Sequence, residues 1–151
     1  MTEVEIHTDG ACLGNPGPGG WAAVLRSGVH YKEITGAEPQ STNQRMELTA
    51  ALEAIRALKW PCRVRLHSDS AYLINAFRQG WLTNWQRNGW RTASGNPVEN
   101  QDLWRALLTA IAPHEITWVK VRGHADDRLN NRCDELARQA AREVSERADL
   151  L

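Results

Sequence analysis

The chain has few cysteines and lacks the long apolar run and the basic N-terminal segment that are typical of membrane-spanning and secreted proteins. Its 151 residues include three cysteines, Cys12, Cys62 and Cys133, an odd and scattered set without a C-x-x-C pair. Such a set favours reduced thiols over a disulfide framework or a zinc site. No apolar run approaches the roughly 20 residues of a membrane span. Residues 1–5 are acidic where a signal peptide would be basic, so we expect a cytoplasmic protein.

An excess of one charge is also absent. Lys and Arg number 18, as do Asp and Glu, so the formal net charge is zero. This argues against a nucleic-acid binder that relies on bulk positive charge. Residues 78–97 differ, with three arginines, no acid, and Trp81, Trp85 and Trp90. Two interpretations stay open: a cationic, aromatic surface for a nucleic-acid backbone, or a Trp-rich helical segment packed on a small core.

The chain contains no internal repeat, low-complexity tract or linker. Its length predicts a single domain over residues 1–151, long enough to need no disulfide or metal for stability. The charged tail, about 142–151, is expected to fray. We also expect a monomer without an obligate protein partner.

The spacing of apolar residues predicts the order of the elements. Residues 4–12 alternate as a strand, and Trp21–Ser27 with Tyr31–Thr35 reads as a hairpin around Gly28. Ser41 or Thr42 is expected to open a helix, with Ser41 and Gln44 as a capping box. A strand at 63–67, a helix at 70–79 and the Trp-rich segment should follow. The last elements expected are a helix capped by Asn100, a strand at 115–121, and a helix carrying Cys133 to Val144.

This order predicts an α/β fold: a mixed five-stranded sheet, three antiparallel strands then two parallel, flanked by helices. A right-handed crossover through the first helix lays the fourth strand parallel to a neighbour. If that neighbour is the first strand, Asp9 and Asp69 lie side by side, about 5 Å apart. Glu47 and Asp134, from two helices, would then close a ring.

Four carboxylates therefore form the candidate site: Asp9, Glu47, Asp69 and Asp134. An oxygen-only cage selects Mg²⁺ or Mn²⁺, and a pair of such ions is the recurring solution for phosphodiester hydrolysis. Each residue also has an ordinary interpretation. Asp9 could be the polar end of a strand, and Glu47 a surface helix former. Asp69 could be a helix N-cap, and Asp134 a complement to a helix dipole.

With these residues assembled, the chain resembles the type 1 ribonuclease H family, bacterial branch. The resemblance runs from Val4 to about Ala141. It is carried by Thr8 through Gly20, Thr42 through Leu48, Ser68 through Ser70, Asn84-Trp85 with Gly89-Trp90, Gly123 through Ala125, and Asn130 through Ala137. It implies a metal-dependent endonuclease that cuts the RNA strand of RNA–DNA hybrids with little sequence preference, leaving 5′-phosphate and 3′-hydroxyl ends.

The resemblance also assigns residues. Asp9, Glu47, Asp69 and Asp134 match the ligands of two Mg²⁺ ions, for which Mn²⁺ is a possible substitute, and His124 matches a histidine that assists proton transfer or product departure. Substrate contacts match Asn15, Thr42, Asn43 and Gln44, then Trp81, Trp85, Arg87, Trp90 and Arg91 in a protrusion that grips the DNA strand. The sequence departs from many relatives at Ala71 and at Asp126–Leu129.

Several alternatives remain. His124 could be a solvated loop residue, whereas the other histidines, His7, His30, His67 and His114, lie in or near strands and are expected to be structural. The glycine-rich loop at 14–20 lacks the Gly-Lys-Ser/Thr ending of a P-loop, which excludes nucleotide binding there. A junction-resolving or recombination nuclease of the same fold, and a non-catalytic hybrid-binding module, are the rival functions.

Overall fold

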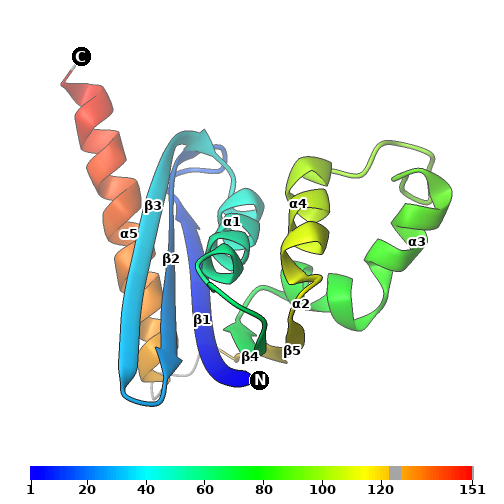
Figure 1. Cartoon of the computed structure of the whole chain (residues 1–151). Coiled ribbons are helices and arrows are strands. Elements are labelled where there is room, and N and C mark those ends of the chain that lie inside the picture. The colour runs from blue at the N-terminus through cyan, green and yellow to red at the C-terminus, as the bar shows by residue number, and fades with distance from the viewer. Residues whose placement is uncertain (123–126, 151) are drawn as a thin grey trace.

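A computed structural model describes residues 1–122 and 127–150 (Figure 1). The strands are β1 (Thr2–Cys12), β2 (Gly17–Ser27), β3 (His30–Ser41), β4 (Cys62–Ser68) and β5 (Glu115–Lys120). The helices are α1 (Asn43–Arg56), α2 (Ala71–Arg78), α3 (Trp81–Asn88), α4 (Gln101–Ile111) and α5 (Arg128–Asp149). No helix in these ranges is both long and apolar enough to cross a membrane.

The five strands form one sheet in the order β3-β2-β1-β4-β5. The β1/β2 and β2/β3 pairs are antiparallel, whereas β1/β4 and β4/β5 are parallel. The predicted mixed sheet and the parallel pairing of the first and fourth strands are thus confirmed. In the β1/β4 register His7 lies opposite His67, so Asp9 and Asp69 leave neighbouring strands at the same edge of the sheet.

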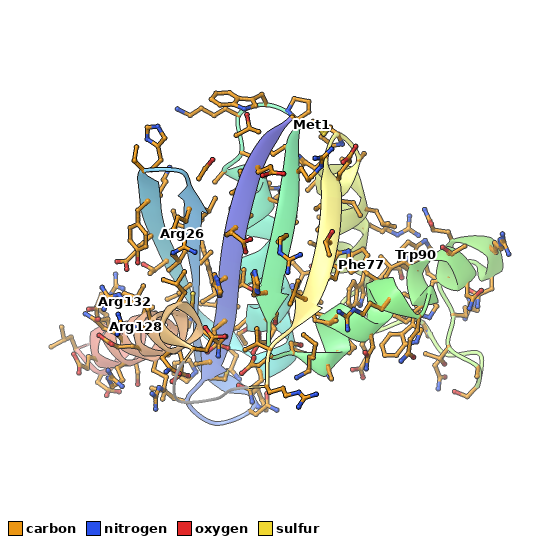
Figure 2. The ribbon with its side chains drawn as sticks, turned by 90° about the horizontal axis from the view of Figure 1, so that it is seen from below. Met1, Arg26, Phe77, Trp90, Arg128 and Arg132 are labelled. Carbon is orange, nitrogen blue, oxygen red and sulfur yellow. The ribbon has the colours of Figure 1, made fainter. Side chains whose placement is uncertain are left out.

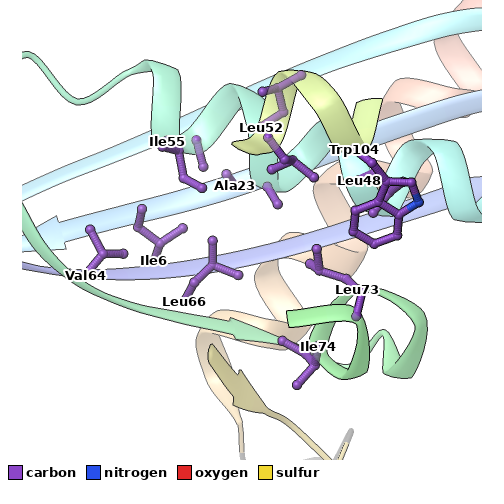
Figure 3. Close-up of a cluster of buried hydrophobic side chains, with 14 of the residues drawn as sticks. Ile6, Ala23, Leu48, Leu52, Ile55, Val64, Leu66, Leu73, Ile74 and Trp104 are labelled. Carbon is purple, nitrogen blue, oxygen red and sulfur yellow. The ribbon is translucent and has the colours of Figure 1, made fainter. Parts of the chain in front are cut away.

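Helices cover the sheet on both faces. On one face α1 packs over β1 and β2 and α4 packs beside α1, with Ile6, Leu48, Leu66 and Trp104 fully buried in the core on this side (Figure 3). On the other face α5 lies over β1–β3, where Cys133 packs in a small apolar cluster (Figure 1). The two apolar layers hold α1 and α5 at fixed positions relative to β1, which is the strand that carries Asp9.

The backbone of α5 approaches β2 very closely at Gly20. A Cβ added at Gly20 would lie 2.1 Å from the carbonyl oxygen of Ala137 and 2.6 Å from the nitrogen of Ala141. Only glycine allows this contact without a shift of the helix. The contact fixes the part of α5 that bears Asp134.

The structure corrects two local predictions. The Thr42 hydroxyl accepts from the Arg45 amide and caps α1, so the Ser41 capping box is wrong. Asn100 occupies the N-cap position of α4, but its side chain makes no capping hydrogen bond. Helix α5 continues to Asp149, with a hydrogen bond from Gln139 to Glu143, and fraying of the tail from about residue 142 stays a prediction.

Candidate active site

Three of the four predicted carboxylates meet at one edge of the sheet. Each of Asp9, Glu47 and Asp69 places a carboxylate oxygen within 4.8 Å of the others. Asp9 lies in β1 and is only 4% exposed, whereas Glu47 comes from the start of α1 and Asp69 directly follows β4. Residues far apart in the chain are therefore brought together by the parallel β1/β4 pair and the crossover helix between those strands.

Glu47 reaches this cluster because β1 has no side chain at Gly10. A Cβ there would lie 2.5 Å from the backbone nitrogen of Glu47 and 2.5 Å from the carbonyl carbon of Met46. The helix backbone thus rests directly on the strand. The Gly10 amide also donates to Oδ1 of Asp9 at 2.9 Å, which fixes one oxygen of that carboxylate.

Asp69 is not the N-cap of the helix that follows it. The Ser70 hydroxyl accepts from the Leu73 amide at 3.2 Å and caps α2, while the Ser68 hydroxyl accepts from the Ser70 amide at 3.0 Å. The capping interpretation of Asp69 is therefore wrong. Its carboxylate is left to face the cluster.

Asp134 approaches the cluster from α5. Its charge contributes to raising the pKa of both Asp9 and Asp69, so it faces them, although it lies outside the group of three. Asp134 forms an ion pair with Arg138 at 2.5 Å and its side chain is 42% exposed. Because α5 begins at Arg128, Asp134 lies beyond the first turn, where a favourable effect of the helix dipole has faded.

The cluster carries more negative charge than its surroundings compensate. Burial and the charge of Asp69 raise the pKa of Asp9 from 3.8 to about 7. Burial and the charge of Asp9 raise the pKa of Glu47 well above its ordinary value. Burial also raises the pKa of Asp69, although Lys120 opposes this shift. Carboxylates this close together repel one another when they are ionised, and a bound cation would compensate their negative charge.

The donor set fits a hard divalent ion. Every candidate ligand atom is a carboxylate oxygen, the type that Mg²⁺ and Mn²⁺ prefer. Oε2 of Glu47 is buried and has no hydrogen-bond partner within the described chain. A buried carboxylate oxygen without a partner is costly, and a bound cation would satisfy it. Asp9, Glu47 and Asp69, with Asp134 beside them, can thus hold a divalent metal.

A polar cavity lies close to the start of α1. It has a volume of about 550 Å³ and is lined by Asn15, Thr42, Gln44, Glu99 and Asn100. The Asn15 side chain accepts from the backbone amide of Asn43 at 3.1 Å, which joins the loop after β1 to α1. Three of the residues predicted as substrate contacts, Asn15, Thr42 and Gln44, therefore line one cavity, and the fourth, Asn43, is joined to Asn15 through its backbone.

Comparisons with known proteins agree with this geometry. The ribonuclease H family model matches residues 1–142. A curated ribonuclease H of Moorella thermoacetica is 66% identical over 140 residues, which cover 93% of this chain and 92% of the relative. The chain belongs to the ribonuclease H family. A second member, from Symbiobacterium thermophilum, is also 66% identical, over 93% of this chain and 95% of that protein.

Among solved structures of the ribonuclease H family, LC9-RNase H1 aligns with a TM-score of 0.85 and 31% identity. The alignment covers 95% of this chain and 74% of that one. Its description names it a type 1 RNase H with the type 2 active-site motif. The likeness agrees with the sheet order and the helix placement described above.

Residues that were not predicted as site residues also shape the site of this ribonuclease H family member. The Arg45 guanidinium donates to both carboxylate oxygens of Asp102, at 3.1 and 2.8 Å, and to the Asn100 side chain at 3.2 Å. These bonds join α1 to α4 beside the polar cavity. The sequence did not identify Glu99, Asn100 or Arg45 as site residues, because no local pattern pairs positions more than 50 residues apart.

The Trp-rich segment forms α3, which projects away from the sheet (Figures 1 and 2). Trp81 and Trp85 are partly buried against the core cluster. Trp90 is only 7% exposed and packs at 6.1 Å from Trp85, with the Arg105 guanidinium 4.8 Å from its ring. This burial argues against a direct substrate contact by Trp90 and favours the core-packing interpretation for that residue.

The cationic part of the segment remains on the surface. Arg87 and Arg91 are both exposed. The Arg91 guanidinium donates to the Gly95 carbonyl oxygen at 2.9 Å, which ties it to the following turn. Arg87 and Arg91 can therefore meet a backbone phosphate, whereas the tryptophans mainly hold α3 on the domain. His124 lies outside the described residues, so its role stays a prediction.

Proposed function

We propose that this protein is a ribonuclease H that hydrolyses the RNA strand of RNA–DNA hybrids. The observation that carries the proposal is the convergence of Asp9, Glu47 and Asp69 in a chain that is 66% identical to curated ribonucleases H. Oxygen donors that converge where two parallel strands end, with Asp9 buried and Asp69 exposed, are suited to a divalent metal and to a phosphodiester substrate.

Asp9, Glu47, Asp69 and Asp134 would hold two Mg²⁺ ions, with Mn²⁺ as a possible substitute. When bound, such ions supply a water of lowered pKa and positive charge near the leaving oxygen. Asp9 would be the most firmly positioned of these ligands, because it is buried on the central strand and its Oδ1 is held by the Gly10 amide. The products would carry 5′-phosphate and 3′-hydroxyl ends.

Strand choice would come from the polar cavity at the start of α1. Asn15, Asn43 and Gln44 are exposed, and each offers amide groups that can bond a 2′-hydroxyl. Only RNA carries this group, which is both a donor and an acceptor. Contacts to sugars and phosphates carry no sequence information, so cleavage should depend little on sequence. Thr42, Trp81, Trp85, Arg87 and Arg91 would contribute contacts to the DNA strand.

The test offers the purified protein four labelled substrates of one sequence: an RNA–DNA hybrid, duplex RNA, duplex DNA and single-stranded RNA. Each is incubated with Mg²⁺, with Mn²⁺ or with EDTA. The proposal predicts cleavage of the RNA strand of the hybrid only, and none in EDTA. Cleavage of duplex DNA would support the junction-nuclease alternative, whereas hybrid binding without cleavage in either metal would support the binding-module alternative.

A further inference from the structure

A second cluster of possible metal ligands lies on the sheet face opposite α1. Glu5 and His7 occupy alternate positions of β1, and His67 lies opposite His7 on β4. The three side chains each place one ligand atom within 4.8 Å of the others. This part of the sheet, β1, β4 and β5, is left open beside α5 in the view of Figure 2. We expected the two histidines to be structural.

His7 is the member that most needs a partner. Its side chain is 7% exposed, and its Nδ1 is buried without a hydrogen-bond partner within the described chain. A buried nitrogen in this condition is costly unless something binds it. A neutral imidazole ring keeps a lone pair on one of its two nitrogens, and that nitrogen can bind a metal.

His67 and Glu5 lie beside the His7 ring. The His67 ring stacks on the His7 ring, with centroids 4.2 Å apart and planes 5° from parallel. Nε2 of His67 contacts Oε2 of Glu5, and the other Glu5 oxygen forms an ion pair with Nε of Arg65 at 3.3 Å. Stacked rings direct their lone pairs side by side, so one ring must tilt to share an ion. His67, at 16% side-chain exposure, has the room to do so.

We propose that Glu5, His7 and His67 form a binding site for a zinc-class divalent ion. Two imidazoles and one carboxylate, with a fourth position open, are a donor set that zinc uses repeatedly. In a tetrahedral zinc site with bonds of about 2.0–2.2 Å, the ligand atoms lie roughly 3.4 Å apart. The contact between Glu5 and His67 would therefore have to widen and the His67 ring to tilt, while the other ligand atoms, which lie within 4.8 Å of one another, adjust around the ion.

Nitrogen donors distinguish this site from the carboxylate cluster. Imidazole suits zinc, cobalt, nickel and copper, whereas Mg²⁺ prefers oxygen alone. The two clusters would thus take different ions although they lie on the same two strands. His7 precedes Asp9 by two residues, as His67 precedes Asp69, which separates the clusters by roughly 6.6 Å along the strands.

The surroundings set the fourth ligand and limit the affinity. A cavity of about 690 Å³ adjoins both histidines and is lined by Arg26, Lys120, Arg122 and Arg128, with Asp127 as its acidic residue. The cationic side chains favour water or a small anion at the open position. They also oppose a bare divalent charge, so the Glu5 carboxylate is essential, and binding should be weaker than at a closed structural zinc site.

The test measures Zn²⁺ binding to the metal-stripped full chain by competition with a chromophoric chelator, in excess Mg²⁺. We expect one equivalent of Zn²⁺ to bind. His67→Asn and Glu5→Gln should each weaken binding at least about tenfold. His30→Asn, at an exposed histidine of the β2–β3 hairpin, is the matched control and should bind as wild type does. Circular dichroism verifies that each variant is folded. His67 is replaced rather than His7 because His67 is partly exposed, so its variant is expected to fold.

Two further measurements separate this site from other ligands. Asp9→Asn should keep full Zn²⁺ affinity, because the site is independent of the proposed catalytic cluster. Bound Co²⁺ should show no thiolate charge-transfer band. Unchanged binding in His67→Asn, loss of binding in Asp9→Asn, a thiolate band, or the absence of an equivalent of bound Zn²⁺ would each overturn the proposal.

Discussion

The backbone nitrogen of Glu47 lies only 2.5 Å from the point where a Cβ of Gly10 would be. Strand β1 and helix α1 therefore touch backbone to backbone, immediately beside Asp9. The contact sets how far Glu47 extends over the strand and hence how close its carboxylate comes to that of Asp9. The glycine next to Asp9 is thus required by the packing of this protein's own helix.

Gly10→Ala should damage both stability and activity. The new methyl group has to displace α1, and overpacking of this kind costs about 1–3 kcal/mol in unfolding free energy. Because the displacement moves Glu47 away from Asp9, hybrid cleavage at saturating substrate should also fall. Urea unfolding and single-turnover cleavage measure the two effects. Normal stability together with normal cleavage would show that α1 does not rest on β1 at Gly10.

Asp9→Asn should stabilise the metal-free protein at neutral pH. The pKa of Asp9 is raised in the fold from 3.8 to about 7, so the native state is favoured while Asp9 is protonated. That contribution is complete below pH 4 and is lost as the pH rises through 7. Asn keeps the oxygen that accepts from the Gly10 amide. The gain in unfolding free energy should be at least about 1 kcal/mol at pH 8, with an upper bound of about 4 kcal/mol.

Urea melts of wild type and Asp9→Asn between pH 4 and pH 8, in EDTA and in Mg²⁺, measure this gain. It should be near zero at pH 4 and should shrink in Mg²⁺, which stabilises the wild-type native state. Asp102→Asn is the control, because Arg45 lowers the pKa of that exposed carboxyl. A gain that does not depend on pH, or one that Asp102→Asn shares, would contradict repulsion within the cluster.

His124→Ala should slow hybrid cleavage about 10²-fold with little change in KM, as expected for a positioned group that assists proton transfer. An unperturbed histidine titrates near pH 6.5, which suits such a role. His30→Ala, at an exposed histidine in β3, is the control and should cleave normally. Steady-state kinetics on a labelled hybrid measure the turnover and KM of both variants. Full activity in His124→Ala would support the alternative that His124 is a solvated loop residue without a role in cleavage.

Replacing Arg87 and Arg91 together by Ala should raise KM and leave saturated turnover nearly unchanged. Each lost phosphate contact reduces the slope of log KM against log salt by about 0.9, so the double variant should lose up to about 2. Arg142→Ala, an exposed arginine of α5, is the control. KM and salt dependence at wild-type values in the double variant would mean that the segment serves packing alone.

The order of the elements was predictable because each has a clear local signal. Alternation identified β1, and the 3–4 spacing identified α1 and α5. The crossover rule then gave the parallel β1/β4 pair without any knowledge of contacts. Local signals failed where two neighbouring residues could fill the same role. Ser41 and Thr42 are both good caps, and only the path of β3, which extends through Ser41, selects Thr42.

The four carboxylates were predictable from spacing and resemblance, but their surroundings were not. The sequence could not show that Ser70 rather than Asp69 caps α2, or that Trp90 is buried beneath Arg105. Both depend on tertiary packing. The Glu5, His7 and His67 cluster was missed for the same reason, since His67 joins the other two only through strand register.

We propose that the carboxylate cluster carries out metal-dependent cleavage of the hybrid. The most direct test is single-turnover cleavage of a labelled RNA–DNA hybrid in Mg²⁺ by wild type, Asp9→Asn and the control Glu146→Gln, an exposed acid of α5. Hybrid binding is measured in parallel. We expect Asp9→Asn to bind the hybrid without cleaving it, and Glu146→Gln to cleave as wild type does. Cleavage by Asp9→Asn at a near-normal rate would contradict the account.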